Sequence, residues 1–279
     1  MNNTEEKIVF NCVAHRPDVE RLSVHLYRTP IPPRTHSGFA LAVVTKGLKR
    51  LNHMGIMHEV PAGSLTLLNP DELHAIEPDN QQGVIYQALH VPTSAMMDVA
   101  PQGFVFPTPV LHNASIARRF AEQLIVLDAT RNNALWNERL SDILYHASAL
   151  FSSRNNRPVS HEDHRISLVR TYIEEHINEN LEIETLSALI DLSKFHFIRL
   201  FKENVGATPH AYIQARRTAR AKLMLQTRPP IQVASLCGFV DQSHLTRWIK
   251  ACYGTTPSAY HKRFRAAGRG IAEPMAASG

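Results

Sequence analysis

Hydrophobic residues recur at two different spacings along this chain, and each spacing dominates its own part. Between Phe39 and Pro92, short runs rich in Val, Leu and Tyr are broken by turn residues such as Gly47, Gly55 and Pro70. Short strands separated by such turns are typical of a β-sandwich or barrel. Beyond residue 164, apolar residues instead recur every three or four positions, as in amphipathic helices. The pattern predicts an α+β chain of two domains.

Two amphipathic helices are predicted between these parts, over Ala114–Ala129 and Ala134–Phe151, and we expect both to pack on the barrel. The polar segment that follows contains Pro158 and lacks periodicity, which predicts a linker. The last residues are small and Gly/Ala-rich, which predicts a frayed end. The expected parts are a first domain (1–151), a linker (152–164), a second domain (165–266) and a flexible tail (267–279).

The second domain repeats itself with an offset of 48 residues. Phe201–Tyr212 has the sequence FKENVGATPHAY, and Ile249–Tyr260 has the sequence IKACYGTTPSAY. Stacked repeat arrays generally contain about three or more copies. A tandem pair of small modules therefore fits two copies better than a solenoid does.

Each copy has the pattern of a helix, a tight turn and a second helix. Ser193 caps the predicted helix Lys194–Lys202 in the first copy, and Asp241 caps the predicted helix Gln242–Cys252 in the second. Gly, Thr and Pro close both copies and predict a further helix after each, because Thr is a favoured cap and Pro a favoured first residue. The second domain is therefore predicted to be all-α, with two helix-turn-helix modules.

Positive charge is concentrated in these modules. Lys194–Arg265 contains 13 Lys or Arg and two acidic residues, a net charge of +11, whereas residues 1–160 contain 14 residues of each sign. Focused positive charge suits the phosphates of DNA, whose counterions are released on binding. A solvated basic face is the alternative for an arbitrary basic stretch. The duplicated helix-turn-helix pattern favours a DNA-binding surface.

Residues 165–266 resemble the DNA-binding domain of the AraC/XylS family of bacterial transcription regulators. The resemblance rests on LSKFHFIRLFKENVGATPHAYI, on the basic linker RRTARAKLML and on IQVASLCGFVDQSHLTRWIKACYGTTPSAYHKRFR. The sequence departs from the family pattern at Asp191, where Gly is common, at Val240, where Ser is common, and at Ile249, where Phe is common. Asp tolerates a left-handed turn better than most residues, and Asp241 can replace the missing Ser as a cap.

The resemblance implies which side chains contact DNA. Arg199 and Arg247 are expected to bond guanine and Gln242 to bond adenine. Phe195 and Ile198 can touch thymine methyl groups, with core packing as the alternative for both. The two reading helices are expected to enter successive major grooves about 34 Å apart. The expected contacts, including those that position the DNA backbone, are Lys194, Phe195, Ile198, Arg199, Lys202, Gln242, Ser243, Thr246, Arg247 and Lys250.

The stretch His36–Pro92, with PAGSLTLLNPDELH at its centre, resembles the cupin-like effector-binding domain found N-terminal in many AraC/XylS regulators. The implied fold is a cupin-like β-barrel with flanking helices, followed by the all-α tandem helix-turn-helix domain. A small-molecule effector is expected in the apolar lumen. Core or rim placement is the alternative for each candidate lining residue, and these are His36, Phe39, His74 and Tyr86.

A cupin-type enzyme or carrier with an accessory DNA-binding domain is the alternative function. Cupin enzymes resemble one another in an H-x-H-plus-Glu cluster and a later His, and here only His36 and His74 stand near those positions. Catalytic metal sites usually present three protein ligands, and the sequence contains no nucleophile elbow, phosphate loop or dinucleotide fingerprint. We therefore expect no catalytic residues, no metal and no cofactor. The other N-terminal histidines are scattered along the sequence: His15, His25, His53, His58 and His90.

The remaining features concern compartment and partners. Cys12, Cys237 and Cys252 form no close pair, and the last two are expected to be buried thiols. No leader and no apolar run of membrane length occurs, which predicts a cytoplasmic protein without a membrane partner. The family resemblance implies an activator, with double-stranded DNA, a small-molecule effector and RNA polymerase as partners, and a homodimer. A ligand-free barrel that only dimerises is a third possibility.

Overall fold

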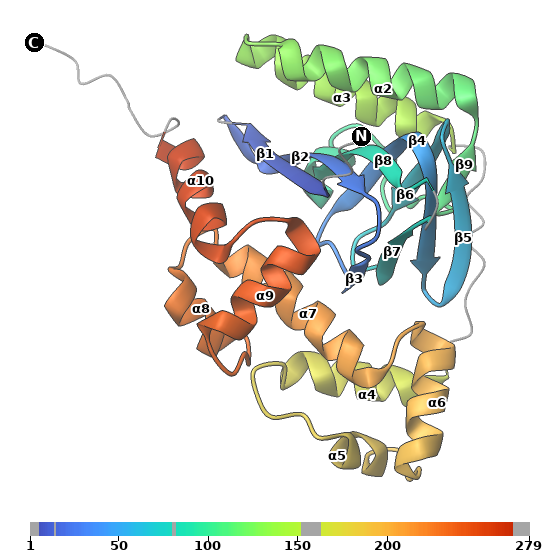
Figure 1. Cartoon of the computed structure of the whole chain (residues 1–279), viewed down its shortest axis with the longest axis vertical. Helices are drawn as coiled ribbons and strands as arrows, with labels where there is room; N and C mark the ends of the chain where they lie inside the picture. Colours follow the sequence, from blue (N-terminus) through green and yellow to red (C-terminus); the bar gives the residue numbers. More distant parts are fainter. Residues whose placement is uncertain (1–5, 14, 80–81, 152–162, 270–279) are drawn as a thin grey trace, which may run out of the picture.

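The computed structural model describes residues 6–13, 15–79, 82–151 and 163–269. The N-terminal part is built on antiparallel strands, which Figure 1 draws in blue to green. In the described residues there are nine: β1 (Lys7–Val13), β2 (Arg16–Leu26), β3 (Ile31–Arg34), β4 (Phe39–His53), β5 (Ile56–Pro61), β6 (Ser64–Leu68), β7 (His74–Pro78), β8 (Val84–Val91) and β9 (Val110–His112).

These strands form one open sheet. Its hydrogen-bonded order is β1-β2-β8-β4-β6-β9, and the long strand β4 also pairs with β5 and β7. No hydrogen bond joins β1 to β9 within the described chain, so the expectation of a closed barrel is wrong. Strand β1 instead contacts a C-terminal helix, in which Arg263 donates a hydrogen bond to the carbonyl oxygen of Phe10 at 2.7 Å. This contact is part of the reason why β1 does not pair with β9.

The alternation of strand residues gives the sheet two apolar faces. Leu41 and Val43 of β4 belong to one buried cluster, and Ala42 and Val44 belong to another. The first face is covered by three N-terminal helices, α1 (Thr93–Met97), α2 (Ala114–Ala129) and α3 (Asn133–Ala149). Helices α2 and α3 lie along the top of Figure 1. The two predicted helices are thus confirmed, α2 with the expected bounds, and α3 beginning one residue earlier and ending two residues earlier than expected.

The C-terminal part is entirely helical in the described residues. Ser193 accepts a hydrogen bond from the amide of His196, and Asp241 accepts one from the amide of His244, so both predicted caps are confirmed. Asp191 in the first turn has a φ of 52°, the left-handed conformation expected of it. The helices are α4 (His164–Glu175), α5 (Ile183–Ala188), α6 (Lys194–Val205), α7 (Pro209–Met224), α8 (Pro230–Leu236), α9 (Gln242–Tyr253) and α10 (Pro257–Arg269).

Two helices extend slightly beyond the expected bounds of the second domain (165–266). Helix α4 begins at His164, the last residue of the expected linker, and residues 152–162 of that linker lie outside the described residues. Helix α10 continues to Arg269, three residues into the expected tail (267–279). The rest of the tail, 270–279, lies outside the described residues.

The two helix-turn-helix modules pack against different parts of the N-terminal sheet domain. The first module has its own buried cluster, to which Leu73 of the sheet domain contributes. The second module shares a single cluster with the second face of the sheet, in which Leu22, Tyr86, Tyr253 and Tyr260 all lie. Figure 1 shows α7 running between the modules beside β3. The helical domain therefore covers the face of the sheet that α2 and α3 leave uncovered.

Candidate nucleic-acid interface and interdomain cavity

Helix α6 presents one apolar face to the core and one mixed face to solvent. Phe197, Phe201 and Val205 are buried, which anchors the helix in the first module. Phe195, at the start of the helix, is 84% exposed, so its side chain is not part of the core. Ile198 is half-buried against the same cluster and therefore fits the packing alternative more closely than Phe195 does.

The exposed cations of α6 form only weak ion pairs. Lys194 lies 2.5 Å from Glu184, and Arg199 lies 3.7 Å from Glu203, with all four side chains about half exposed or more. Exposed pairs of this kind typically contribute between zero and about 1 kcal/mol. Both cations can therefore exchange their acidic partners for a DNA phosphate or base at little cost.

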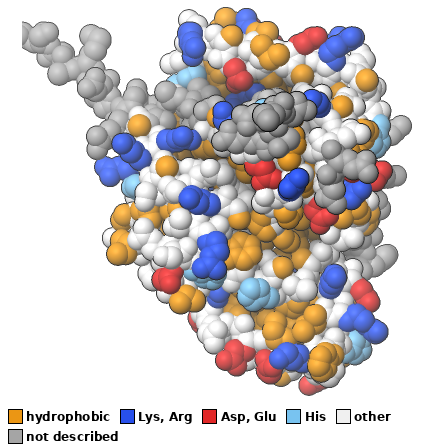
Figure 2. Space-filling model, viewed as in Figure 1, with side chains coloured by type: hydrophobic (Ala, Val, Ile, Leu, Met, Phe, Trp, Pro, Cys, Tyr) orange, Lys and Arg blue, Asp and Glu red, His pale blue; other side chains and the backbone are white. Residues whose placement is uncertain are grey.

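Helix α9 repeats this arrangement in the second module. Leu245 and Ile249 are buried, whereas Gln242, Ser243 and Arg247 are exposed. The structure thus places the ten expected DNA contacts on the outer faces of two equivalent helices, with Ile198 and Thr246 half-buried and the other eight exposed. Figure 2 shows several Lys and Arg side chains on the left of the molecule, where Figure 1 draws α8–α10. Their individual roles on DNA remain predictions.

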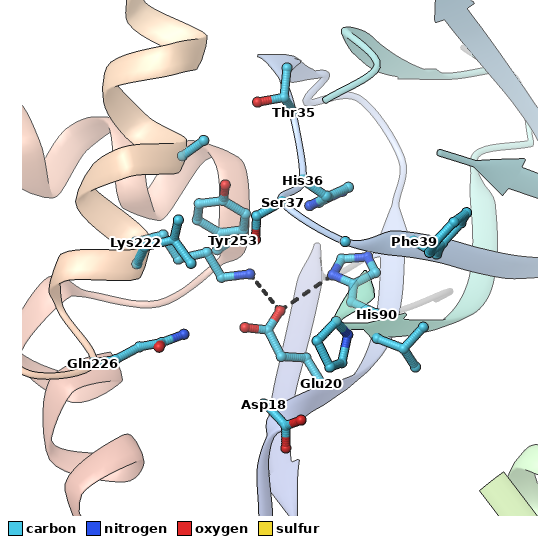
Figure 3. Close-up of a pocket in the computed structure, with 15 residues that line it drawn as sticks. Asp18, Glu20, Thr35, His36, Ser37, Phe39, His90, Lys222, Gln226 and Tyr253 are labelled. Atoms are coloured by element: carbon cyan, nitrogen blue, oxygen red, sulfur yellow. Dashed lines mark hydrogen bonds and ion pairs between the residues drawn. The ribbon is translucent and has the colours of Figure 1, made fainter. Parts of the chain in front are cut away.

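A cavity of about 190 Å³ opens where the sheet meets α7 and α9. Strand β2 provides one wall, the β3–β4 connection and β8 provide another, and the two helices close the third side (Figure 3). Polar and aromatic side chains dominate this lining. Those labelled in Figure 3 are Asp18, Glu20, Thr35, His36, Ser37, Phe39, His90, Lys222, Gln226 and Tyr253.

Glu20 joins three elements at the centre of this cavity. Its Oε2 atom accepts a hydrogen bond from Lys222 Nζ of α7 at 2.5 Å and lies 3.3 Å from His90 Nδ1 of β8. Its Oε1 atom accepts a hydrogen bond from the hydroxyl of Tyr260 in α10 at 3.0 Å. Burial opposes ionisation, but the charge of Lys222 and the hydrogen bonds from His90 and Lys222 lower the pKa of Glu20 to about 2. A buried carboxylate of the sheet domain is therefore bonded to two helices of the helical domain.

Three histidines gather beside this carboxylate. The ring centroid of His36 lies 4.1 Å from that of His90 and 4.8 Å from that of His74. Burial lowers the pKa of His90 to about 4 and holds the pKa values of His36 and His74 well below their ordinary value, so the rings are neutral at pH 7. The fold thus brings His90 beside His36, although the two are far apart in the sequence. In the described residues no three His, Cys, Asp or Glu side chains are placed to hold a metal ion.

Two buried polar atoms at this site lack a hydrogen-bond partner. They are Nε2 of His36 and Oγ1 of Thr35, whose side chains are almost fully buried. Buried polar groups are normally satisfied, and those left over in a cavity can bond to a ligand or to water. The cavity thus offers both a charged pair and unused hydrogen-bonding atoms to a small polar molecule.

Of the four expected effector residues, two line this cavity. These two are His36 and Phe39. His74 packs against His36 but does not line the cavity. Tyr86 is buried in the core, where its ring centroid lies 4.7 Å from Lys49 Nζ. Sequence reasoning missed the residues that make the site distinctive, Glu20 above all. Glu20 and Lys222 are separated by 202 positions, so no local pattern marks them as a pair.

Known protein families match both halves of the chain. Residues 16–148 match the model of the AraC-like ligand binding domain, and residues 186–263 match the model of a helix-turn-helix domain. The chain belongs to the AraC family of transcription regulators. It combines an N-terminal ligand-binding domain with a C-terminal DNA-binding domain, as the resemblance implied. In this AraC-family chain, Glu20 and His90 fall in the first matched region and Lys222 and Tyr253 in the second, so the cavity lies between the two functional parts.

Curated relatives of this AraC-family chain are themselves named as regulators. It is 29% identical over 226 residues to the uncharacterized HTH-type transcriptional regulator YbfI of Bacillus subtilis, a match that covers 77% of this chain and 81% of YbfI. It is 37% identical over 95 residues to the probable transcriptional regulator LumQ of Photobacterium leiognathi, covering 33% of this chain and 38% of LumQ. The LumQ match therefore extends over little more than a third of that relative.

A solved structure shares the two-domain fold. The crystal structure of an apo ToxT variant from Vibrio cholerae strain SCE256 superposes with a TM-score of 0.53 at 12% identity, covering 88% of this chain and 98% of that one. At this identity the likeness shows the fold alone. Within the described residues, no helix is both long enough and apolar enough to cross a membrane.

Proposed function

We propose that this chain is a transcription activator whose DNA binding is controlled by a small polar effector in the interdomain cavity. The observation that supports this best is the bonding of Glu20, which contacts His90 of the ligand-binding domain and both Lys222 and Tyr260 of the DNA-binding domain. An effector that bonds to Lys222 competes with Glu20 and changes how the sheet domain holds α7. Because α7 connects the two modules, the relative placement of α6 and α9 changes with it.

The effector contacts that we assign combine expected and unexpected residues. His36 and Phe39 line the cavity together with Glu20, Lys222 and Tyr253, and we propose that an effector touches these side chains directly. His74 and Tyr86 are proposed to support the site from behind rather than to touch the effector. The functional parts are a ligand-binding and dimerisation domain (1–151), a linker (152–164) and a DNA-binding domain (165–266).

DNA is recognised by the outer faces of α6 and α9. Arg199 and Arg247 are proposed to bond guanine, and Gln242 to bond adenine, while the exposed lysines contact phosphates. Phe195 is proposed to contact a thymine methyl group, since its side chain is exposed and has no core role. One chain then recognises two short boxes about one helical turn apart.

Several further properties belong to the same proposal. The chain acts in the cytoplasm by binding rather than by catalysis, without a metal or cofactor, and contacts RNA polymerase. It forms a homodimer through α2 and α3, where Ile125 is 69% exposed and Tyr145 is 57% exposed, because exposed apolar side chains on one helical layer favour self-association.

A genome-wide DNA pull-down with the purified full chain tests the proposal. Fragments are enriched with and without a metabolite extract and are then searched for a shared motif. The expected result is two boxes about one helical turn apart, with enrichment that changes on adding the extract. The double variant Arg199→Ala and Arg247→Ala should lose the motif. Enrichment without any motif would mean that the basic surface binds phosphates alone, and the proposed readout would be wrong.

A further inference from the structure

A second cavity, of about 230 Å³, lies on the other face of the sheet, beneath α2 and α3. Its floor is formed by Leu41, Leu65 and Leu67, and its walls by Phe120 and Ile143. All five side chains are buried, and none contributes to the lining of the interdomain cavity. An apolar cavity of about 150 Å³ lined by similar residues stays dry and binds benzene. This larger cavity therefore has the room and the lining for an apolar molecule.

The mouth of this cavity is polar and has unused hydrogen-bonding capacity. Arg119 and Gln123 of α2 line it, and their side chains make no hydrogen bond or ion pair with other described residues. His146 of α3 donates from Nδ1 to the carbonyl oxygen of Asp142 at 2.7 Å. Arg119 is the only charged residue among the described residues that line this cavity. A ligand that matches the site has an apolar body and one negative charge at the mouth.

An adjoining hollow of about 210 Å³ extends the site along the groove between the two helices. It shares Arg119, Gln123 and Ile143 with the first cavity, and its other lining residues are Glu122, Val126, Arg139 and Asp142. Arg119 therefore lines both hollows. A ligand longer than one ring can extend into the second hollow without losing its contact with this cation.

We propose that the cavity beneath α2 and α3 binds a small apolar molecule that bears one anionic group, with its apolar body over Leu41 and Leu67 and its anion on Arg119. Arginine forms strong, paired hydrogen bonds with carboxylates and related oxyanions. The site is separate from the proposed effector cavity, because the two are lined by different residues on opposite faces of the sheet. The chain therefore has a second ligand site, whose occupant contacts the helices proposed to form the dimer.

Calorimetric titration of the full chain with naphthalene-2-carboxylate tests this proposal, with neutral naphthalen-2-ylmethanol as the matched ligand. We expect the carboxylate to bind and the alcohol to bind at least about tenfold more weakly, since charge-assisted hydrogen bonds to Arg119 are lost. Arg119→Ala should weaken binding of the carboxylate by about the same factor. Arg118→Ala, which changes an exposed neighbouring arginine outside the cavity, should leave binding unchanged.

Two further variants locate the ligand. Ala147→Phe places a ring in the cavity and should abolish binding, whereas Leu223→Trp places a ring at the interdomain cavity, on an exposed residue, and should not. Because Arg119 is exposed, Arg119→Ala keeps the test valid if Ala147→Phe fails to fold. No binding to the unaltered chain, or binding lost in Leu223→Trp and kept in Arg119→Ala, would overturn the proposal. Sedimentation of the same samples shows whether a second copy of the chain covers the site, and a groove buried in a dimer that excludes the probe would also overturn it.

Discussion

Gly206 and Gly254 occupy the same position in the two repeats, and both pack against the ligand-binding domain. Gly206 ends α6 with a φ of 84°, and Gly254 ends α9 with a φ of 67°. These are the two helices that are expected to contact DNA bases. A Cβ atom at Gly206 would overlap the backbone nitrogen of Gly55, and one at Gly254 would overlap the side chain of Ile8. The sheet domain therefore contacts the C-terminal ends of both α6 and α9, and its position is linked to that of both DNA-contacting helices.

Gly206→Ala should lower the free energy of unfolding more than Gly103→Ala does. Both glycines have a left-handed backbone, which makes alanine unfavourable by roughly 1 kcal/mol. Only at Gly206 does the backbone of Gly55 obstruct the new methyl group, whereas nothing lies within 4 Å at Gly103. Overpacking of this kind costs about 1–3 kcal/mol more. Urea unfolding measures the difference, and equal losses would show that the two domains do not touch here in solution.

Glu20→Gln should destabilise the chain strongly, because it leaves the buried cation of Lys222 without its anionic partner. Removing one member of a buried pair costs about 3–5 kcal/mol. Glu184→Gln is the matched control: Glu184 lies 2.5 Å from Lys194, but both side chains are about half exposed or more, so its loss should cost far less than that of Glu20. Chemical denaturation of both variants gives the comparison.

A double-variant cycle isolates the interaction energy of Glu20 with Lys222 from the interactions of each with other residues. Adding Lys222→Met to Glu20→Gln removes the unpaired charge, so the double variant should be more stable than Glu20→Gln alone. If the two losses simply add, Glu20 and Lys222 do not interact, and the proposed link between the effector cavity and α7 is absent.

Features that depend on neighbouring residues were predictable from the sequence. Ser193 and Asp241 were expected to cap α6 and α9, and they do, because a cap bonds an amide three positions away. The bounds of α2 were likewise predicted, because its apolar positions recur at helical spacing.

Features that depend on distant residues were not predictable. Glu20 meets Lys222 across 202 positions, and His90 lies near His36 only because β8 pairs with β4 in a particular register. The open sheet was missed for a similar reason. Closure of a barrel depends on which elements meet the outermost strands, and at β1 that element is the distant helix α10.

Thermal stability should decrease as the pH falls from about 6.5 towards 4. Burial, near the charges of Lys222 and Arg34, lowers the pKa of His90 to about 4, so the unfolded chain binds a proton at a higher pH than the folded chain does. The contribution of neutral His90 is fully present above its ordinary pKa of 6.5 and is lost as the pH falls through 4. At about 1.4 kcal/mol per pKa unit, it amounts to roughly 3 kcal/mol.

The other groups at this site act in the same direction. Burial also holds the pKa of His36 well below its ordinary value, so this ring resists protonation over the same range. Because the pKa of Glu20 is lowered to about 2, its protonation causes a further loss of stability between about pH 4.5 and 2. Melting temperatures measured from about pH 7.5 to 4 test this, with His90→Gln expected to give a shallower slope. His164→Gln, a change at an exposed histidine, should keep the slope of the unaltered chain. A melting temperature independent of pH would contradict the burial of the three rings.

Arg247→Ala and Lys250→Ala should weaken DNA binding in different ways, although the two side chains are exposed on the same helix. Loss of a guanine-bonding arginine should cost about 1–3 kcal/mol at one base pair and relax the preference there. Loss of a phosphate-contacting lysine should weaken binding to all sequences alike and reduce the slope of log affinity against log salt by about one. Fluorescence anisotropy with the enriched site and single-base variants, at two salt concentrations, separates these outcomes. A uniform loss in Arg247→Ala would assign Arg247 to the DNA backbone, and base reading by α9 would then rest on Gln242 and Ser243.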